Sequence, residues 1–210
     1  MVPPRQIKID AAGRYAVRNP GGLWPRIATV LRLPQEEISA LRRMVEEALN
    51  RGSIGYKEAV SICGSEDLAA DIVMLAQELG LLLPYDPKSR CLEWDSAPLS
   101  PRSSLVLNPA VREVLKGLEE GKSLSEALEG LFRELGLSEG GRRMVEISLD
   151  LISQDVVDGS RIASSCRSHG LKGFESTAVA VLKASGIISP ILSSSWPSGD
   201  VRYRACRFLR

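Results

Sequence analysis

The stretch that decides the fold runs from Ile38 to Trp94 and reads ISALRRMVEEALNRGSIGYKEAVSICGSEDLAADIVMLAQELGLLLPYDPKSRCLEW. Apolar residues recur at three- and four-residue spacing and predict helices, with Gly52 and Gly80 ending two of them. Two short apolar runs flank the turn-forming residues 86–89 and predict a β-hairpin. The expected elements are helices over 34–51, 56–63 and 66–79, one short strand at 53–55, and strands over 81–85 and 90–94.

Much of this pattern occurs a second time. The pentapeptide RRMVE at residues 42–46 recurs at residues 142–146, and a pentapeptide match with further matches behind it indicates an internal repeat. The later matches keep their order, with an offset that grows from 100 to 106 residues. Val156-Val157 corresponds to Ile54, and residues 160–168 correspond to the second helix. In the third helix, Phe174, Ala178, Val181 and Ser185 correspond to Leu68, Ile72, Leu75 and Leu79. Gly186 then corresponds to Gly80, and Pro190 to Pro84.

The order helix, strand, helix, helix, hairpin resembles the winged-helix superfamily over residues 34–95 and again over 139–210. The resemblance implies a mainly α fold with small β-hairpins, an α+β protein built from tandem winged-helix (helix-turn-helix) domains joined by a helical segment. It also implies binding to double-stranded DNA through the third helix and the wing, although members can serve as protein-interaction modules. The segregation and condensation protein B family has a similar two-unit architecture and length, but no sequence motif links this chain to it.

These observations divide the chain into four segments. Residues 1–22 form a basic N-terminal arm, 23–96 the first winged-helix domain, 97–138 a linker plus a helical pair, and 139–210 the second winged-helix domain. The linker composition of residues 96–104 and the Ser123–Glu126 capping box support the third segment. No apolar run reaches the roughly 20 residues that a membrane span needs. We expect a cytoplasmic protein, and the excess of arginine over lysine is compatible with a thermophilic source.

The first unit is acidic. Residues 23–96 hold 8 basic and 12 acidic residues, and residues 65–80 contain no lysine or arginine. Carboxylates on a third helix would be repelled by the phosphates of DNA, so this helix is a candidate protein-interaction surface or a solvated face. The candidate protein-interaction residues are Glu66, Asp67, Asp71 and Glu78.

The second unit is basic, with 10 basic and 7 acidic residues over 139–210. Arginines alternate with apolar residues after Asp200, which places them on one face of the return strand of the second wing. A wing with arginines beside a third helix with few acids can follow phosphates. The candidate nucleic-acid-binding residues are Arg161, Arg167, His169, Lys172, Ser176, Thr177, Lys183, Trp196, Arg202, Arg204 and Arg207.

The four cysteines occupy apparently parallel positions, two at the ends of second helices and two on return strands. One bridge per unit, Cys63–Cys91 and Cys166–Cys206, is conceivable, against a default of reduced thiols in a cytosol. Their spacing contains no Cys-x-x-Cys motif, and the chain has a single histidine, so we expect no metal site. Phosphate-binding glycine loops and nucleophile motifs are also missing, so we expect neither a cofactor nor catalysis.

Two functions of different classes remain open. The first is a DNA-binding factor associated with transcription regulation or with the chromosome, which would grip duplex DNA through the second unit. The second is an adaptor that holds a protein partner and has little affinity for DNA. A homodimer is compatible with either function.

Overall fold

The computed structural model describes residues 32–86, 91–92, 104–137, 140–191 and 201–209. The predicted basic arm and the candidate Trp196 lie outside this part. The described chain is mainly helical with short antiparallel strands, so the predicted α+β class is confirmed. We call residues 32–107 the first half. Its elements are α3 (Gln35–Arg51), β1 (Ile54–Gly55), α4 (Tyr56–Cys63), α5 (Glu66–Glu78), β2 (Leu82–Asp86), β3 (Cys91–Leu92) and β4 (Ser104–Leu107).

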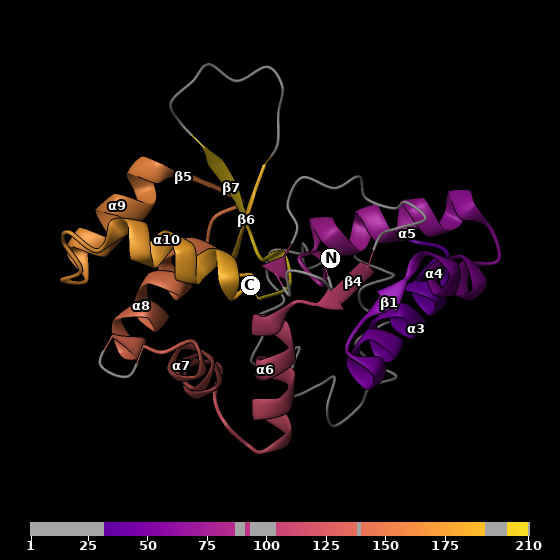
Figure 1. Cartoon of the computed structure of the whole chain (residues 1–210), viewed down its shortest axis with the longest axis horizontal. Coiled ribbons are helices and arrows are strands. Elements are labelled where there is room, and N and C mark those ends of the chain that lie inside the picture. The colour runs from indigo at the N-terminus through magenta and orange to yellow at the C-terminus, as the bar shows by residue number, and fades with distance from the viewer. Residues whose placement is uncertain (1–31, 87–90, 93–103, 138–139, 192–200, 210) are drawn as a thin grey trace.

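Residues 140–209, the second half, repeat the order helix, strand, helix, helix, strand, strand. Its elements are α8 (Gly141–Ile152), β5 (Val156–Asp158), α9 (Gly159–Ser168), α10 (Glu175–Ala184), β6 (Ile188–Pro190), β7 (Arg202–Ala205) and the 3-10 helix η2 (Arg207–Leu209). The halves lie side by side, and α6 (Pro109–Glu119) and α7 (Leu124–Glu134) connect them (Figure 1). No helix in the described ranges is both long enough and apolar enough to cross a membrane.

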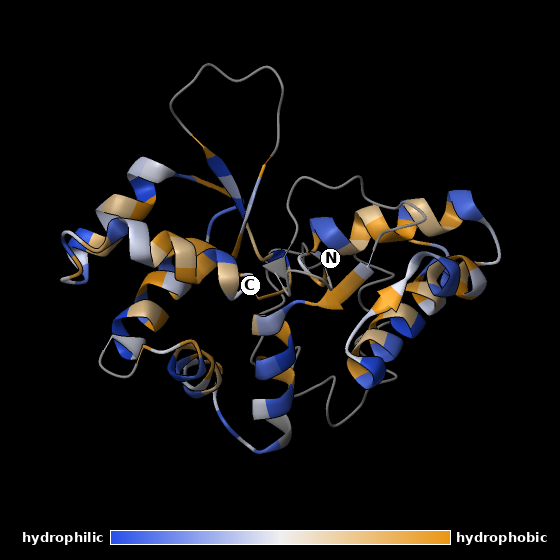
Figure 2. Ribbon diagram, in the orientation of Figure 1, coloured by the Kyte–Doolittle hydropathy of each residue, from blue (hydrophilic) through white to orange (hydrophobic). Residues whose placement is uncertain are grey.

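The connecting helices begin where the sequence predicts. Pro109 follows Asn108 and starts α6, while the Ser123 hydroxyl and the Glu126 carboxylate cap α7 reciprocally. The α6 helix is hydrophobic on one side and hydrophilic on the other (Figure 2). Its buried residues join the hydrophobic core, and α7 packs against both α6 and α8. The core therefore runs through both halves and the connection.

Each half has its own small antiparallel sheet, in which the last strand of the half lies between two other strands. The order is β1-β4-β2-β3 in the first half and β5-β7-β6 in the second. The predicted hairpin of β2 and β3 is present, but the strand that pairs with both β1 and β2 is β4. The sequence prediction missed β4, because Ser104-Leu105-Val106-Leu107 follows a serine- and proline-rich stretch that has the composition of a linker.

The pairing registers give the residue correspondence between the halves. In the first half Leu105 pairs with Ile54 on one side and with Pro84 on the other. In the second half Tyr203 pairs with Val157 and with Pro190 in the same way. These registers agree with the predicted correspondence of Pro84 with Pro190.

The repeated pentapeptide has the same structural role in both halves. Its methionine and valine are buried in α3 and in α8, and its glutamate is exposed in both. The second arginine, Arg43 or Arg143, donates a hydrogen bond to a backbone carbonyl near the end of the next helix, at Ile62 or at Gly170. The repeat thus ties the first helix of each half to the second.

The buried face of α5 differs from the prediction. The expected stripe of Leu68, Ile72, Leu75 and Leu79 is buried only at Ile72, and its three leucines are half-buried. The helix is rotated so that the small residues Ala69 and Ala76, with Ile72 and Val73, face the core. Small side chains allow the close approach of helices, and their burial is harder to recognise from sequence than that of leucine.

The halves meet at Asn108, whose side chain is completely buried. Its amide nitrogen donates hydrogen bonds to the carbonyl oxygens of Gly80, at 2.7 Å, and Gly186, at 2.9 Å. Its amide oxygen accepts a hydrogen bond from the backbone N–H of Ala110. Buried carbonyls without donors destabilise a fold by about 1–3 kcal/mol each, so this single side chain stabilises both halves together.

The contacts at this junction are approximately reciprocal, because exchanging the two halves maps each contact onto its counterpart. The Ala110 N–H donates to the Ser185 carbonyl, and the Phe208 N–H donates to the Leu79 carbonyl, both at 2.9 Å. These donors occupy corresponding positions, as do the two acceptors. The Cys206 thiol, which corresponds to Asn108, lies 3.5 Å from the Gly80 carbonyl oxygen. The junction therefore has the reciprocal character of a two-fold dimer interface within one chain.

Candidate nucleic-acid interface

The third helix of the second half, α10, has an uncharged outer face. Ser176, Thr177, Ala180 and Ala184 are exposed there, while Ala178 and Leu182 are buried. The two hydroxyl side chains predicted as candidates therefore do point away from the core. Small neutral residues on a helix allow its backbone to come close to a polar or anionic surface without repulsion.

Glu175 is the only acid in α10, and its carboxylate interacts with nearby backbone N–H groups and cations. Hydrogen bonds from the backbone N–H groups of Glu175 and Gly173 lower the pKa of its carboxyl group, and the nearby Arg167 and Lys172 lower this pKa further. Arg167 and Lys172 themselves are exposed, and neither forms an ion pair within the described ranges. Two candidate cations therefore lie close to the N-terminus of α10.

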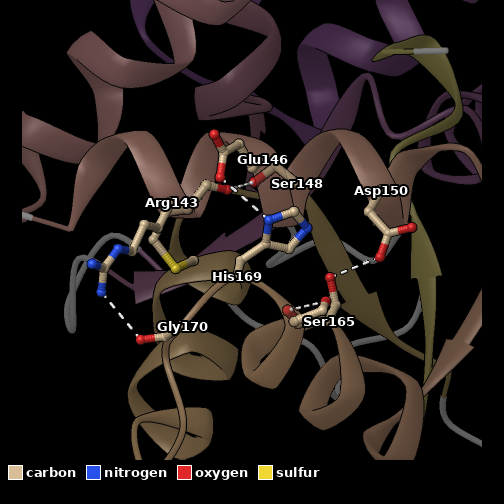
Figure 3. A network of polar contacts seen from close by, with 9 residues as sticks. Arg143, Glu146, Ser148, Asp150, Ser165, His169 and Gly170 are labelled. Carbon is tan, nitrogen blue, oxygen red and sulfur yellow. Dashed lines mark hydrogen bonds and ion pairs between the residues drawn. The ribbon is translucent and has the colours of Figure 1, made fainter.

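The remaining candidates on α9 and the turn after it are held by carboxylates of α8. Arg161 lies 2.6 Å from Asp150, which also accepts a hydrogen bond from the Ser165 hydroxyl. His169 contacts Glu146 at 3.2 Å through its Nδ1 atom (Figure 3). These contacts fix α9 against α8, so Arg161 and His169 have structural partners and are weaker candidates for phosphate binding.

The return strand β7 alternates as predicted. Tyr203 and Ala205 are buried, whereas Arg202 is exposed and Arg204 is partly exposed. Arg202 lies close enough to Asp158 to contribute to lowering the pKa of that carboxyl group, behind the larger effects of hydrogen bonds from Arg161 and Ser160. Arg207 departs from the pattern, because it lies in η2 and its guanidinium is 3.6 Å from Asp155.

The surface of the second half therefore separates the candidates into two groups. Those that border α10 and β7 with outward side chains are Arg167, Lys172, Ser176, Thr177, Arg202 and Arg204, and of these Arg202 also lies near Asp158. Arg161, His169 and Arg207 are engaged by acids, whereas Lys183, in the last turn of α10, is partly exposed like Arg204. Within the described residues, the second half has nine arginines and lysines and five acids, whereas the first half has five and ten.

The corresponding helix of the first half, α5, has an acidic outer face. All four predicted acids, Glu66, Asp67, Asp71 and Glu78, are exposed. Glu66 hydrogen-bonds the Tyr56 hydroxyl, and this bond raises the pKa of the tyrosine. Met74 lies among these acids with 49% of its surface exposed. A helix with this face cannot approach phosphates without repulsion.

The structure corrects the position of Phe174. The repeat placed it at a core position equivalent to Leu68, but its side chain is 61% exposed. It borders an apolar groove of about 400 Å³ between α8 and α10, with Met144, Leu171 and Val181 among the other lining residues. The sequence analysis missed this groove, because the lining residues Met144, Phe174 and Val181 have the spacing of ordinary core residues.

Neither predicted disulfide is formed, since Cys63, Cys166 and Cys206 are free thiols. The predicted parallel of Cys91 with Cys206 fails because β4, not β3, corresponds to β7, so that Asn108 stands where Cys206 stands. Cys206 instead contacts Gly80 and Asn108 at the junction. Complete burial raises the pKa of the Cys206 thiol to about 12, which keeps this thiol protonated and unreactive.

The fold and surface define a mainly helical protein of two related halves with one neutral and one acidic third helix. Residues 26–203 match the model of one protein family, and the chain belongs to that family. The match brings no activity or ligand with it. No curated protein and no solved structure matches the chain.

Proposed function

We propose that this protein is a non-enzymatic tandem winged-helix factor that binds duplex DNA through its second half, in association with the chromosome or with transcription. In the first unit, the three helices in chain order would be α3, α4 and α5, and the wing would be the β2/β4 pair. In the second unit, the three helices would be α8, α9 and α10, and the wing would be the β6/β7 pair. The assignment rests on the element order and on the central position of the last strand in each sheet.

The observation that carries the proposal is the uncharged outer face of α10 with cations at its border. A helix that enters the major groove contacts base edges through cationic, amide, hydroxyl or small apolar side chains, and Ser176 and Thr177 supply hydroxyls. Arg167 and Lys172 near the N-terminus of α10, and Arg202 and Arg204 on β7, would contact phosphates. Binding would therefore combine a neutral reading helix with four flanking charges.

The test is a fluorescence-anisotropy titration of a random-sequence duplex. Four phosphate contacts predict that log K falls against log salt with a slope of about −3 to −4. We expect the double variant Arg202→Glu and Arg204→Glu to reduce affinity about tenfold or more at fixed salt, because each substitution removes a cation and adds a repulsive charge.

The matched control is Arg112→Glu with Arg133→Glu, which changes the net charge equally on the exposed faces of α6 and α7. Equal losses for the two double variants would show that only net charge matters and would contradict the assigned surface. No measurable affinity of the unaltered protein at low salt would contradict the proposal itself.

The alternative is a protein adaptor, favoured by the acidic outer face of α5. A row of carboxylates around an exposed methionine suits a basic protein partner with an apolar pocket. This function predicts a specific partner in a pull-down that is lost with Asp71→Lys, together with no affinity for duplex DNA at moderate salt.

A further inference from the structure

The groove between α8 and α10 is an unfilled apolar surface on the second half. Its walls include Leu137, Met144, Leu171, Phe174 and Val181, and its volume is about 400 Å³. Phe174, at 61% exposure, is the most exposed large hydrophobic residue in the described part of the chain. Such a side chain beside an apolar hollow is typical of a contact surface.

The border of this groove is cationic. Arg143 lines it and is exposed, and Lys172 follows the lining residue Leu171 in the turn before α10. Among the described residues of α8 and α10, two acids lie nearby, and both are engaged. Glu175 accepts hydrogen bonds from backbone N–H groups, and Glu146 contacts His169 (Figure 3). The groove therefore suits an apolar side chain that is flanked by carboxylates.

The first half presents that arrangement on α5. Met74 is 49% exposed, and Asp71 and Glu78 lie one turn before and one turn after it on the same face. Asp67 extends the acidic face by a further turn, and α5 contains no lysine or arginine. Methionine is flexible and polarizable, and it packs well against aromatic rings such as that of Phe174.

We propose that this protein associates with further copies of itself, with the α5 face of one chain docked in the α8/α10 groove of the next. Met74 would enter the groove against Phe174, and Asp71 and Glu78 would face Arg143 and Lys172. Met74 is exposed and the groove is open within one chain, so the contact joins different chains. Because the two surfaces differ, the contact is head-to-tail and produces open chains or closed rings of copies.

Self-association needs no nucleic acid and can be tested without it, although Lys172 and the lining residue Thr177 also belong to the proposed DNA surface. The test is sedimentation velocity of the full chain without DNA over a range of protein concentrations. Above the 22.8 kDa of one chain, we expect the weight-average mass to rise with concentration. The single variants Met74→Arg and Phe174→Asp each remove one surface, and we expect each to weaken self-association about tenfold or more.

A mixture of the two variants provides the decisive experiment. Met74→Arg keeps an intact groove and Phe174→Asp keeps an intact α5 face, so the mixture forms one contact and stops at twice the mass of one chain. The control is Leu49→Arg, an equally exposed apolar position on α3, which leaves self-association unchanged. A wild-type protein that stays monomeric, a single variant that associates like wild type, or a mixture that stays monomeric would each overturn the proposal.

Discussion

The outer faces of α5 and α10 differ at positions that correspond through the 106-residue offset. Asp71, Met74 and Glu78 on α5 stand where Thr177, Ala180 and Ala184 stand on α10, and all six are exposed. The buried positions beside them remain apolar, as Ile72 and Ala178 show. The two halves therefore share one architecture and an apolar core and differ in the chemistry of their surfaces.

The largest expected effect concerns the junction that holds the halves together. Replacing Asn108 with leucine removes the donors to the Gly80 and Gly186 carbonyls and leaves buried acceptors unsatisfied. We expect the free energy of unfolding to fall by about 3 kcal/mol or more, measured by urea denaturation. The control Asn50→Leu lies on the exposed face of α3 and should change stability by less than about 0.5 kcal/mol. Equal losses would show that Asn108 has no special role.

A slightly smaller effect is expected at the glycine that Asn108 contacts. A Cβ atom at Gly186 would lie 2.4 Å from the Asn108 amide oxygen, and the positive φ of 76° adds strain. Gly136 has a similar φ of 89° but open space around it. We expect Gly186→Ala to cost about 2 kcal/mol more than Gly136→Ala, which bears the backbone strain of about 1 kcal/mol alone. Similar melting temperatures for the two variants would contradict the close packing of the junction.

The smallest expected effect on stability concerns the N-terminal caps of the second helices, which differ between the halves. Asp158 caps α9 through a hydrogen bond from the Arg161 N–H, whereas at the corresponding Gly55 the Glu58 carboxylate accepts the backbone N–H. Asp158→Ala should cost about 1 kcal/mol at neutral pH. Hydrogen bonds from Arg161 and Ser160 lower the pKa of Asp158, so this stabilisation is present above about pH 4 and is lost as pH falls through the lower folded pKa.

The matched variant Asp158→Asn separates the cap from its charge. Asparagine retains a capping oxygen but does not titrate, so we expect near-normal stability at neutral pH and a smaller loss of stability in acid. Thermal unfolding of the two variants between about pH 3 and 7 provides the measurement. Parallel pH profiles for wild type and Asp158→Asn would contradict the role of the carboxylate.

Local patterns in the sequence were sufficient for most elements of this fold. The bounds of α4, the cap at Ser123 and the alternation along β7 all follow from neighbouring residues. The missed features depend on contacts between distant residues. Strand β4 is defined by its partners β1 and β2, and Asn108 by two glycines in different halves.

The residue types of the candidate surface could be predicted from the sequence, but its ion pairs and the position of Phe174 could not. The exposed Ser176 and Thr177 and the alternating arginines follow from helix and strand periodicity. The ion pairs that engage Arg161 and Arg207 join α9 to α8 and η2 to the segment before β5, and no local pattern reveals them. The same holds for Phe174, whose spacing is that of a core residue but whose side chain lies at the rim of a groove.

The most direct test exchanges the chemistry of the two third helices. Thr177→Asp with Ala184→Glu gives α10 the carboxylates of α5, and Asp71→Thr with Glu78→Ala removes them from α5. All four positions are exposed, so stability should change little. In an anisotropy titration with duplex DNA, we predict that the α10 variant loses about tenfold or more in affinity, while the α5 variant binds at least as well as wild type. Undiminished binding by the α10 variant would contradict the assignment of the second half as the DNA-binding half.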